Sequence, residues 1–97
     1  MERTLVLETV KKVGQEVLLK GWVNRRRDHG KIIFLDLRDR SGLIQLVITA
    51  PLSQSPEVAE IKPEYVVEVV GTVAARSEKT LNPELPTGTV EVQVKDI

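Results

Sequence analysis

The chain has 97 residues, which suits one domain with one modest core, and 41% of them are apolar. It contains no cysteine and one histidine, which excludes disulfides and the usual zinc sites. The net charge is zero, but residues 1–40 hold ten Lys/Arg against six Asp/Glu, whereas residues 41–97 hold four against eight. We therefore expect a basic patch on a neutral domain, which binds phosphate less strongly than a wholly basic protein does.

The N-terminal segment MERTLVLETVKK lacks the layout of a signal peptide. No apolar run approaches the roughly 18 residues of a membrane span, so we expect a soluble, cytoplasmic domain with no membrane partner. Thr9 is suited to cap a short helical turn over residues 10–13.

Alternating apolar residues predict a first strand over residues 16–25, with Val17, Leu19 and Val23 facing inward. A glycine within this strand, Gly21, indicates a bend or a bulge. A bulge at that position would turn the neighbouring Trp22 toward the core.

Two further strands are predicted over residues 31–39 and 42–49, because both segments alternate cleanly. Their outer faces carry Phe34, Arg38 and Gln45. Their inner faces are expected to be Ile33, Leu35, Leu37, Ile44, Leu46 and Ile48.

Ser55 followed by Pro56 predicts the start of a helix that Pro63 ends. Strands are predicted over residues 65–76 and 89–97, joined by the polar loop RSEKTLNPELPTG. Five strands with one helix between the third and the fourth indicate an all-β, five-stranded Greek-key barrel of the OB type, with residues 1–97 forming a single domain. An SH3-like barrel is the nearest alternative, but it normally lacks that helix.

OB barrels hold single-stranded nucleic acid across their second and third strands, between two flanking loops. A phenyl ring there offers a surface on which a base can stack, guanidinium groups grip phosphate or a base edge, and a glutamine amide reads a Watson–Crick edge. The strands and the first loop supply such groups as Arg25, Arg26, Arg27, Phe34, Arg38 and Gln45. The plainer alternatives are that Phe34 is an ordinary sheet residue, and that Asp36, Asp39 and Arg40 pair with one another or with the arginines.

The sequence contains no glycine-rich phosphate loop, no nucleophile with a candidate base and no metal-binding constellation. We therefore expect this chain to catalyse no reaction by itself and to hold no cofactor.

The segments GWVNRRRDHG, IIFLDLRDRSGLIQLV and VVGTVAARSEKTLNPELPTGTVEV resemble the N-terminal anticodon-binding domain of bacterial-type aspartyl-tRNA synthetases, which are class II enzymes. The resemblance covers nearly the whole chain and includes the FxDxRDRxGxxQ strand pair and the NPxxPTG loop. It implies that the partner is the anticodon loop of tRNA-Asp. It also implies a homodimeric parent enzyme whose catalytic domain, which uses ATP and magnesium, lies downstream; the domain alone is expected to be a monomer.

The resemblance also implies roles for single residues. Arg27, Phe34 and Gln45 match the positions that hold the central uridine of the anticodon, with Phe34 stacking on the base and the other two meeting its polar edge. The positions near the flanking anticodon bases are matched by Arg76, Asn82 and Glu91.

His29 resembles the residue of relaxed enzymes, which also accept tRNA-Asn, whereas Lys79 resembles that of enzymes strict for tRNA-Asp. Both kinds of parent enzyme stay open at this point. Two other functions also stay open: a general single-strand binder that is indifferent to base sequence, and an engineered or ancestral-style OB scaffold that binds protein. The intact set of Arg27, Phe34 and Gln45 favours the RNA interpretation.

Overall fold

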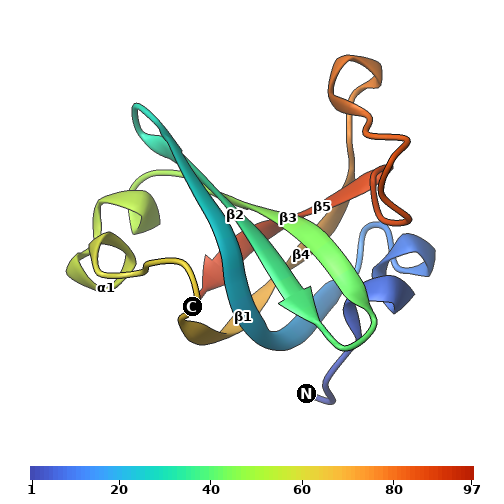
Figure 1. Ribbon diagram of the computed structural model, residues 1–97, viewed down its shortest axis with the longest axis horizontal. Helices are drawn as coiled ribbons and strands as arrows, with labels where there is room; N and C mark the ends of the chain where they lie inside the picture. The colour runs from blue at the N-terminus through green and yellow to red at the C-terminus, as the bar shows by residue number, and fades with distance from the viewer.

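Five strands close into a barrel in the computed structural model, which describes residues 1–97 (Figure 1). The strand order is β1-β2-β3-β5-β4, and β4 pairs with β1 to close the ring. All pairs are antiparallel except β3 with β5, which is parallel. The strands are β1 (Glu16–His29), β2 (Ile32–Asp39), β3 (Gly42–Ile48), β4 (Val66–Ala75) and β5 (Val90–Asp96). This confirms the predicted all-β barrel of the OB type.

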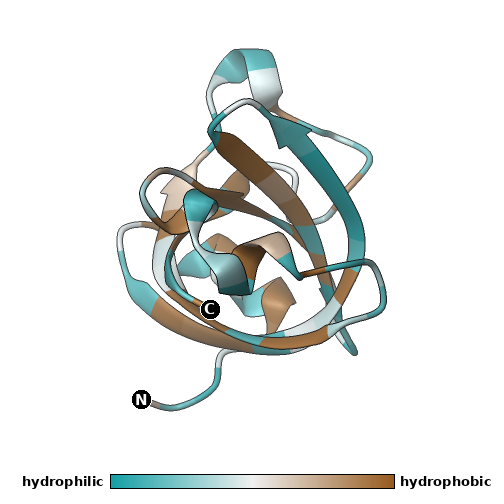
Figure 2. Cartoon of the chain, turned by 90° about the vertical axis from the view of Figure 1, so that its left-hand side faces the viewer, coloured by the Kyte–Doolittle hydropathy of each residue, from teal (hydrophilic) through white to brown (hydrophobic).

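Aliphatic side chains fill the barrel, and the predicted inward faces are confirmed. Burial alternates residue by residue along β2, as expected when successive side chains point to opposite faces. Figure 2 shows long apolar stretches, in brown, within the strands of the barrel. Burying one such aliphatic side chain stabilises the fold by about 1.5–3 kcal/mol. The fully enclosed core residues include Leu19, Leu35, Leu37, Ile44, Leu46 and Ile48.

A short helical segment lies between β3 and β4, as predicted. It consists of η2 (Leu52–Gln54) and α1 (Pro56–Ala59), and the hydroxyl of Ser55 accepts a hydrogen bond from Val58 N at the start of α1. The predicted stop at Pro63 is wrong. The helix ends four residues earlier, where Ile61 N donates to Val58 O and tightens the last turn. None of the helices is long and apolar enough to span a bilayer.

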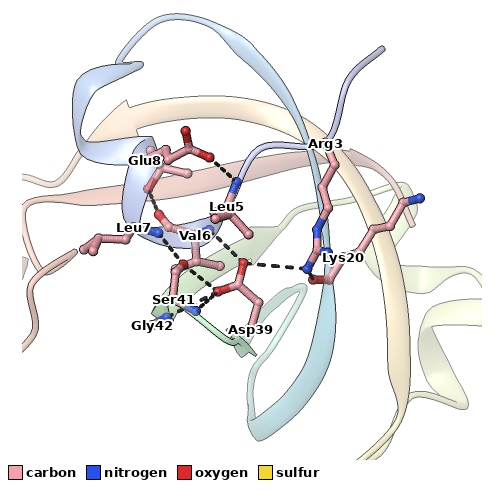
Figure 3. Close-up of polar contacts among 10 residues, drawn as sticks. Arg3, Leu5, Val6, Leu7, Glu8, Lys20, Asp39, Ser41 and Gly42 are labelled. Carbon is pink, nitrogen blue, oxygen red and sulfur yellow. Dashed lines mark hydrogen bonds and ion pairs between the residues drawn. The ribbon is translucent and has the colours of Figure 1, made fainter.

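The N-terminal helix lies earlier than predicted. A 3₁₀ helix, η1 (Val6–Lys11), replaces the turn expected over residues 10–13. Thr9 lies inside this helix and its hydroxyl donates to Val6 O at 2.6 Å, so it does not cap the start. The start is fixed instead by Asp39, whose Oδ2 accepts from Val6 N at 2.8 Å (Figure 3). Because this contact joins residues 33 positions apart, local spacing does not reveal it.

Asp39 also organises the turn between β2 and β3 (Figure 3). Its Oδ1 accepts hydrogen bonds from Ser41 N at 2.7 Å, from the Ser41 hydroxyl at 2.6 Å and from Gly42 N at 3.2 Å. Burial alone would raise the pKa of Asp39, but these bonds and the one from Val6 N outweigh burial and hold the pKa below its ordinary value. Asp39 is therefore structural, as expected, but the expected pairing with Arg40 or the arginine cluster is wrong, because its hydrogen-bond partners are Val6, Ser41 and Gly42.

The irregularity in β1 lies at Asn24 and not at Gly21. The pairing register with β2 shifts between Val23 and Arg25, so one extra residue is inserted there. Trp22 consequently stays on the outer face and is 37% exposed, and its predicted place in the core is wrong. Gly21 has a different task, because a Cβ at this position would lie 2.3 Å from Arg38 O. Glycine lets β2 come this close to β1.

Candidate nucleic-acid interface

A hollow of about 530 Å³ lies beside the outer face of β2 and β3. The β1–β2 turn and the loop between β4 and β5 rise on the same side of the barrel, at the top of the view in Figure 1, and both contribute to it. The lining residues are Arg27, His29, Phe34, Gln45, Arg76, Lys79, Thr80, Leu81 and Asn82. Only Thr80 and Leu81 were not among the predicted site residues; the polar, proline-containing loop that carries them was the available signal.

The bulge at Asn24 decides which arginines reach this face. With the extra residue, Arg27 pairs with Phe34 and Arg25 pairs with Asp36. Residues paired across two strands project on the same face. Without the bulge, strict alternation from Val23 would have turned Arg25 and Arg27 toward the core side.

The Phe34 ring is half-buried and is held by two neighbours. The Arg27 Cζ atom lies 5.5 Å from the ring centroid, within the range of a cation–π contact. The His29 ring lies 5.5 Å away at an interplanar angle of 81°, an edge-to-face arrangement. These contacts fix the orientation of a ring on which a flat group can stack.

Hydrogen bonds join Arg27 and Gln45, which line the hollow, to two acidic side chains beside it. Arg27 Nη2 donates to Asp36 Oδ1 at 3.0 Å and to Gln45 Oε1 at 3.1 Å. Gln45 Nε2 in turn donates to Glu91 Oε1 at 3.4 Å. The expected pairing of Asp36 with the arginine cluster is thereby confirmed. Arg27 Nε is buried without a partner, which leaves one donor of the site unused.

Arg76 and Asn82 shape the β4–β5 loop, which contains η3 (Glu78–Thr80). Arg76 Nε donates to Val90 O at 3.0 Å and its Nη1 donates to Thr80 O at 3.2 Å. Burial lowers the pKa of Arg76 from its ordinary value, and the nearby charge of Glu91 opposes this shift. Asn82 Oδ1 accepts a hydrogen bond from the backbone N–H two residues later, at 3.1 Å.

Four predicted residues do not line the hollow: Glu91, which contacts it only through Gln45, and three arginines. Arg25 is exposed on the outer face, and Arg38 lies farther along that face, opposite Trp22. Arg26 points away from both, because its Nη1 donates to Val58 O at 2.7 Å and to Ile61 O at 2.8 Å.

Arg26 Nε also donates to Asp28 Oδ1 at 2.8 Å. This bond raises the pKa of Arg26 and lowers that of Asp28. The structure thus gives Arg26 a structural task, which is to join β1 to the segment around α1.

The arrangement offers stacking, cationic and amide groups, and no group of three His, Cys, Asp or Glu side chains is placed to hold a metal ion. Residues 17–97 match the tRNA anti-codon family model, described as an OB-fold nucleic acid binding domain. The chain belongs to this family of nucleic acid binding domains.

Its curated relatives are more specific. Over its whole length the chain is 46% identical to an aspartate–tRNA(Asp/Asn) ligase of Magnetococcus marinus. Over 88% of its length it is 54% identical to an aspartate–tRNA ligase of Staphylococcus aureus. It spans only 17% and 15% of these two relatives.

Among solved structures, the asparaginyl-tRNA synthetase of Pyrococcus horikoshii aligns with a TM-score of 0.80 and 29% identity. The alignment covers 98% of this chain and 22% of that one. The similarity to tRNA ligases therefore extends over the entire barrel.

Proposed function

We propose that this chain is the anticodon-binding domain of an aspartate–tRNA ligase and that it binds the anticodon loop of tRNA-Asp. Its family and its relatives support the nucleic-acid role. The observation that carries the proposal is the hollow in which Phe34, Arg27 and Gln45 lie together on the face that OB barrels use for single strands.

Phe34 provides the stacking surface for the central uridine. Such stacking contributes about 1–3 kcal/mol per base and needs an unpaired base, which a loop supplies. Arg27 and Gln45 meet the polar edge of the same base, since both reach the hollow beside the ring. Arg25 and Arg38, on the same outer face, contact phosphates and add a salt-dependent attraction.

The flanking anticodon bases meet the β4–β5 side of the hollow. Arg76 and Asn82 line it there, and Glu91 borders it through Gln45. The Oδ1 atom of Asn82 already accepts a backbone hydrogen bond, so its Nδ2 is the group that faces RNA. Glu91 accepts from an exocyclic amino group, because a carboxylate only accepts.

His29 and Lys79 line the hollow from its two sides. We assign to this pair the choice between a parent enzyme that is strict for tRNA-Asp and one that also accepts tRNA-Asn. Of the two relatives described above, one is named an aspartate–tRNA(Asp/Asn) ligase and the other an aspartate–tRNA ligase.

The catalytic work of the parent ligase, with ATP and magnesium, belongs outside these residues. The parent enzyme is a cytoplasmic homodimer in this proposal, and the barrel alone is a monomer and catalyses nothing.

The test is a binding titration with a tRNA-Asp anticodon stem-loop and with the same stem closed by a loop of scrambled sequence. We expect tighter binding to the tRNA-Asp loop. Equal affinity for the two loops would favour a general single-strand binder, and absence of binding at low salt would indicate a protein-binding scaffold.

A further inference from the structure

The side-chain amide of Gln45 has neighbours of opposite character at its two ends. Its Oε1 accepts from Arg27 at 3.1 Å, and its Nε2 donates to Glu91 at 3.4 Å. A guanidinium only donates and a carboxylate only accepts. The reversed amide would place N–H against N–H at one end and oxygen against oxygen at the other. Both neighbours therefore enforce the same orientation.

Two further features keep the amide from turning. Gln45 is only 9% exposed, so its side chain has little room to adopt another rotamer. The guanidinium that holds its oxygen is itself held, because Arg27 Nη2 also donates to Asp36 at 3.0 Å.

We propose that Glu91 is a positioning residue that fixes the orientation of the Gln45 amide and so makes the site select uridine over cytidine. This inference rests on the proposed function, in which the selected base stacks on Phe34. Glu91 acts through Gln45, independently of any contact of its own with a flanking base.

The preference for uridine over cytidine follows from the hydrogen-bonding groups of Gln45 that its neighbours leave free. After its contacts with Arg27 and Glu91, the amide retains one N–H donor and one acceptor lone pair. Uracil presents an acceptor at O4 beside a donor at N3, whereas cytosine presents a donor at N4 beside an acceptor at N3. For a base held in one pose over Phe34, the polar edges of uracil and cytosine need opposite orientations of the Gln45 amide. Binding of cytidine therefore requires the reversed amide of Gln45, in which its N–H group faces Arg27 and its oxygen faces Glu91.

Glu91→Gln is the decisive variant, because a neutral amide at position 91 can donate or accept and so permits Gln45 to turn. The measurement is the ratio of affinities for two anticodon stem-loops that differ only in uridine or cytidine at the middle position. We expect this ratio to fall about tenfold or more, the usual effect of one lost hydrogen bond to a charged group. Glu68→Gln, the same charge loss at an exposed site on β4, is the matched control and should keep the wild-type ratio.

The outcomes separate the two proposals. A wild-type protein that binds both loops equally overturns the proposed function and this inference together. If wild type prefers uridine but Glu91→Gln keeps the full ratio, only the inference is overturned. A variant that loses affinity for both loops by the same factor also overturns it, since that result assigns Glu91 a direct or merely structural contact.

A second measurement needs no RNA. The side-chain amide protons of Gln45, observed by NMR in the free protein, should exchange with water more slowly in wild type and in Glu68→Gln than in Glu91→Gln. Equal exchange in all three proteins contradicts the positioning role.

Discussion

Arg26 and Arg27 are neighbours in the chain, yet their guanidinium groups bind on opposite faces of β1. Arg26 Nη1 lies 2.7 Å from Val58 O, and Arg27 Nη2 lies 3.0 Å from Asp36 Oδ1. The three consecutive arginines therefore have different surroundings. Arg26 supports the helical segment after β3, Arg27 lines the hollow, and Arg25 is exposed on the outer face.

The first prediction concerns this division. Arg26→Ala should lower the free energy of unfolding by about 1–3 kcal/mol, because the carbonyls of Val58 and Ile61 lose their donor. Arg27→Ala should instead reduce affinity for the anticodon stem-loop. Chemical denaturation and RNA titration of both variants measure the two effects. Reduced RNA affinity with unchanged stability in Arg26→Ala would contradict the assignment.

Phe34→Ala should cost about 1–3 kcal/mol of binding free energy toward the tRNA-Asp stem-loop, the usual contribution of one stacked base. Val66→Ala is the control, since Val66 is 82% exposed and lies outside the hollow. Titrations should be made below the unfolding transition of each variant. Phe34→Ala binding as tightly as Val66→Ala would show that the ring supports the sheet and nothing more.

The strands and their inward faces could be predicted because a period of two is a local signal, as in Leu35 and Leu37. The start of η1 could not be predicted from local sequence, because it depends on a hydrogen bond from Val6 N to Asp39, 33 positions away. The bulge at Asn24 has no glycine to mark it, whereas Gly21, which indicates a bulge in the sequence, marks a close approach of two strands; the inward turn of Trp22 expected from a bulge at Gly21 is therefore wrong.

The residues of the candidate site also separate into those that the sequence could predict and those that it could not. Phe34 and Gln45 follow from strand alternation, and Gln45 is where alternation places it, beside the ring. Which of Arg26 and Arg27 faces the hollow depends on the bulge, since alternation alone only makes the two point to opposite faces. Thr80 and Leu81 reach the hollow only through the path of a loop that has no periodic pattern.

The acid stability of the barrel should depend on Asp39. Its pKa is lower in the folded protein than the unfolded value of about 3.9, so its ionised form adds stability that is fully present above that value. This contribution is lost as the pH falls through the folded pKa. Asp39→Asn should therefore be less stable than wild type at neutral pH, and the difference should shrink below about pH 4.

Urea denaturation at several pH values measures this difference. Asp96→Asn, at an exposed position near the C-terminal end of β5, is the matched control and should show no such gap at neutral pH. A gap between wild type and Asp39→Asn that stays constant down to pH 2 would contradict the linkage.

The β4–β5 loop depends on a glycine at position 88. A Cβ there would lie 1.6 Å from Asn82 O, so Gly88→Ala must displace the segment that carries Asn82. We expect weaker binding of the anticodon stem-loop, while the strand amides of β1 and β2 keep their protection in hydrogen exchange. Unchanged RNA affinity in this variant would show that the loop takes no part in binding.

The most direct test of the account is a titration of the wild-type chain against anticodon stem-loops that differ only at the middle base, at two salt concentrations. Affinity for every loop should fall as salt rises, because the arginines on the outer face contact phosphates. The uridine loop should bind most tightly at both concentrations, because Phe34, Arg27 and Gln45 act on the base. Equal affinity for all the loops would contradict the reading of the central uridine.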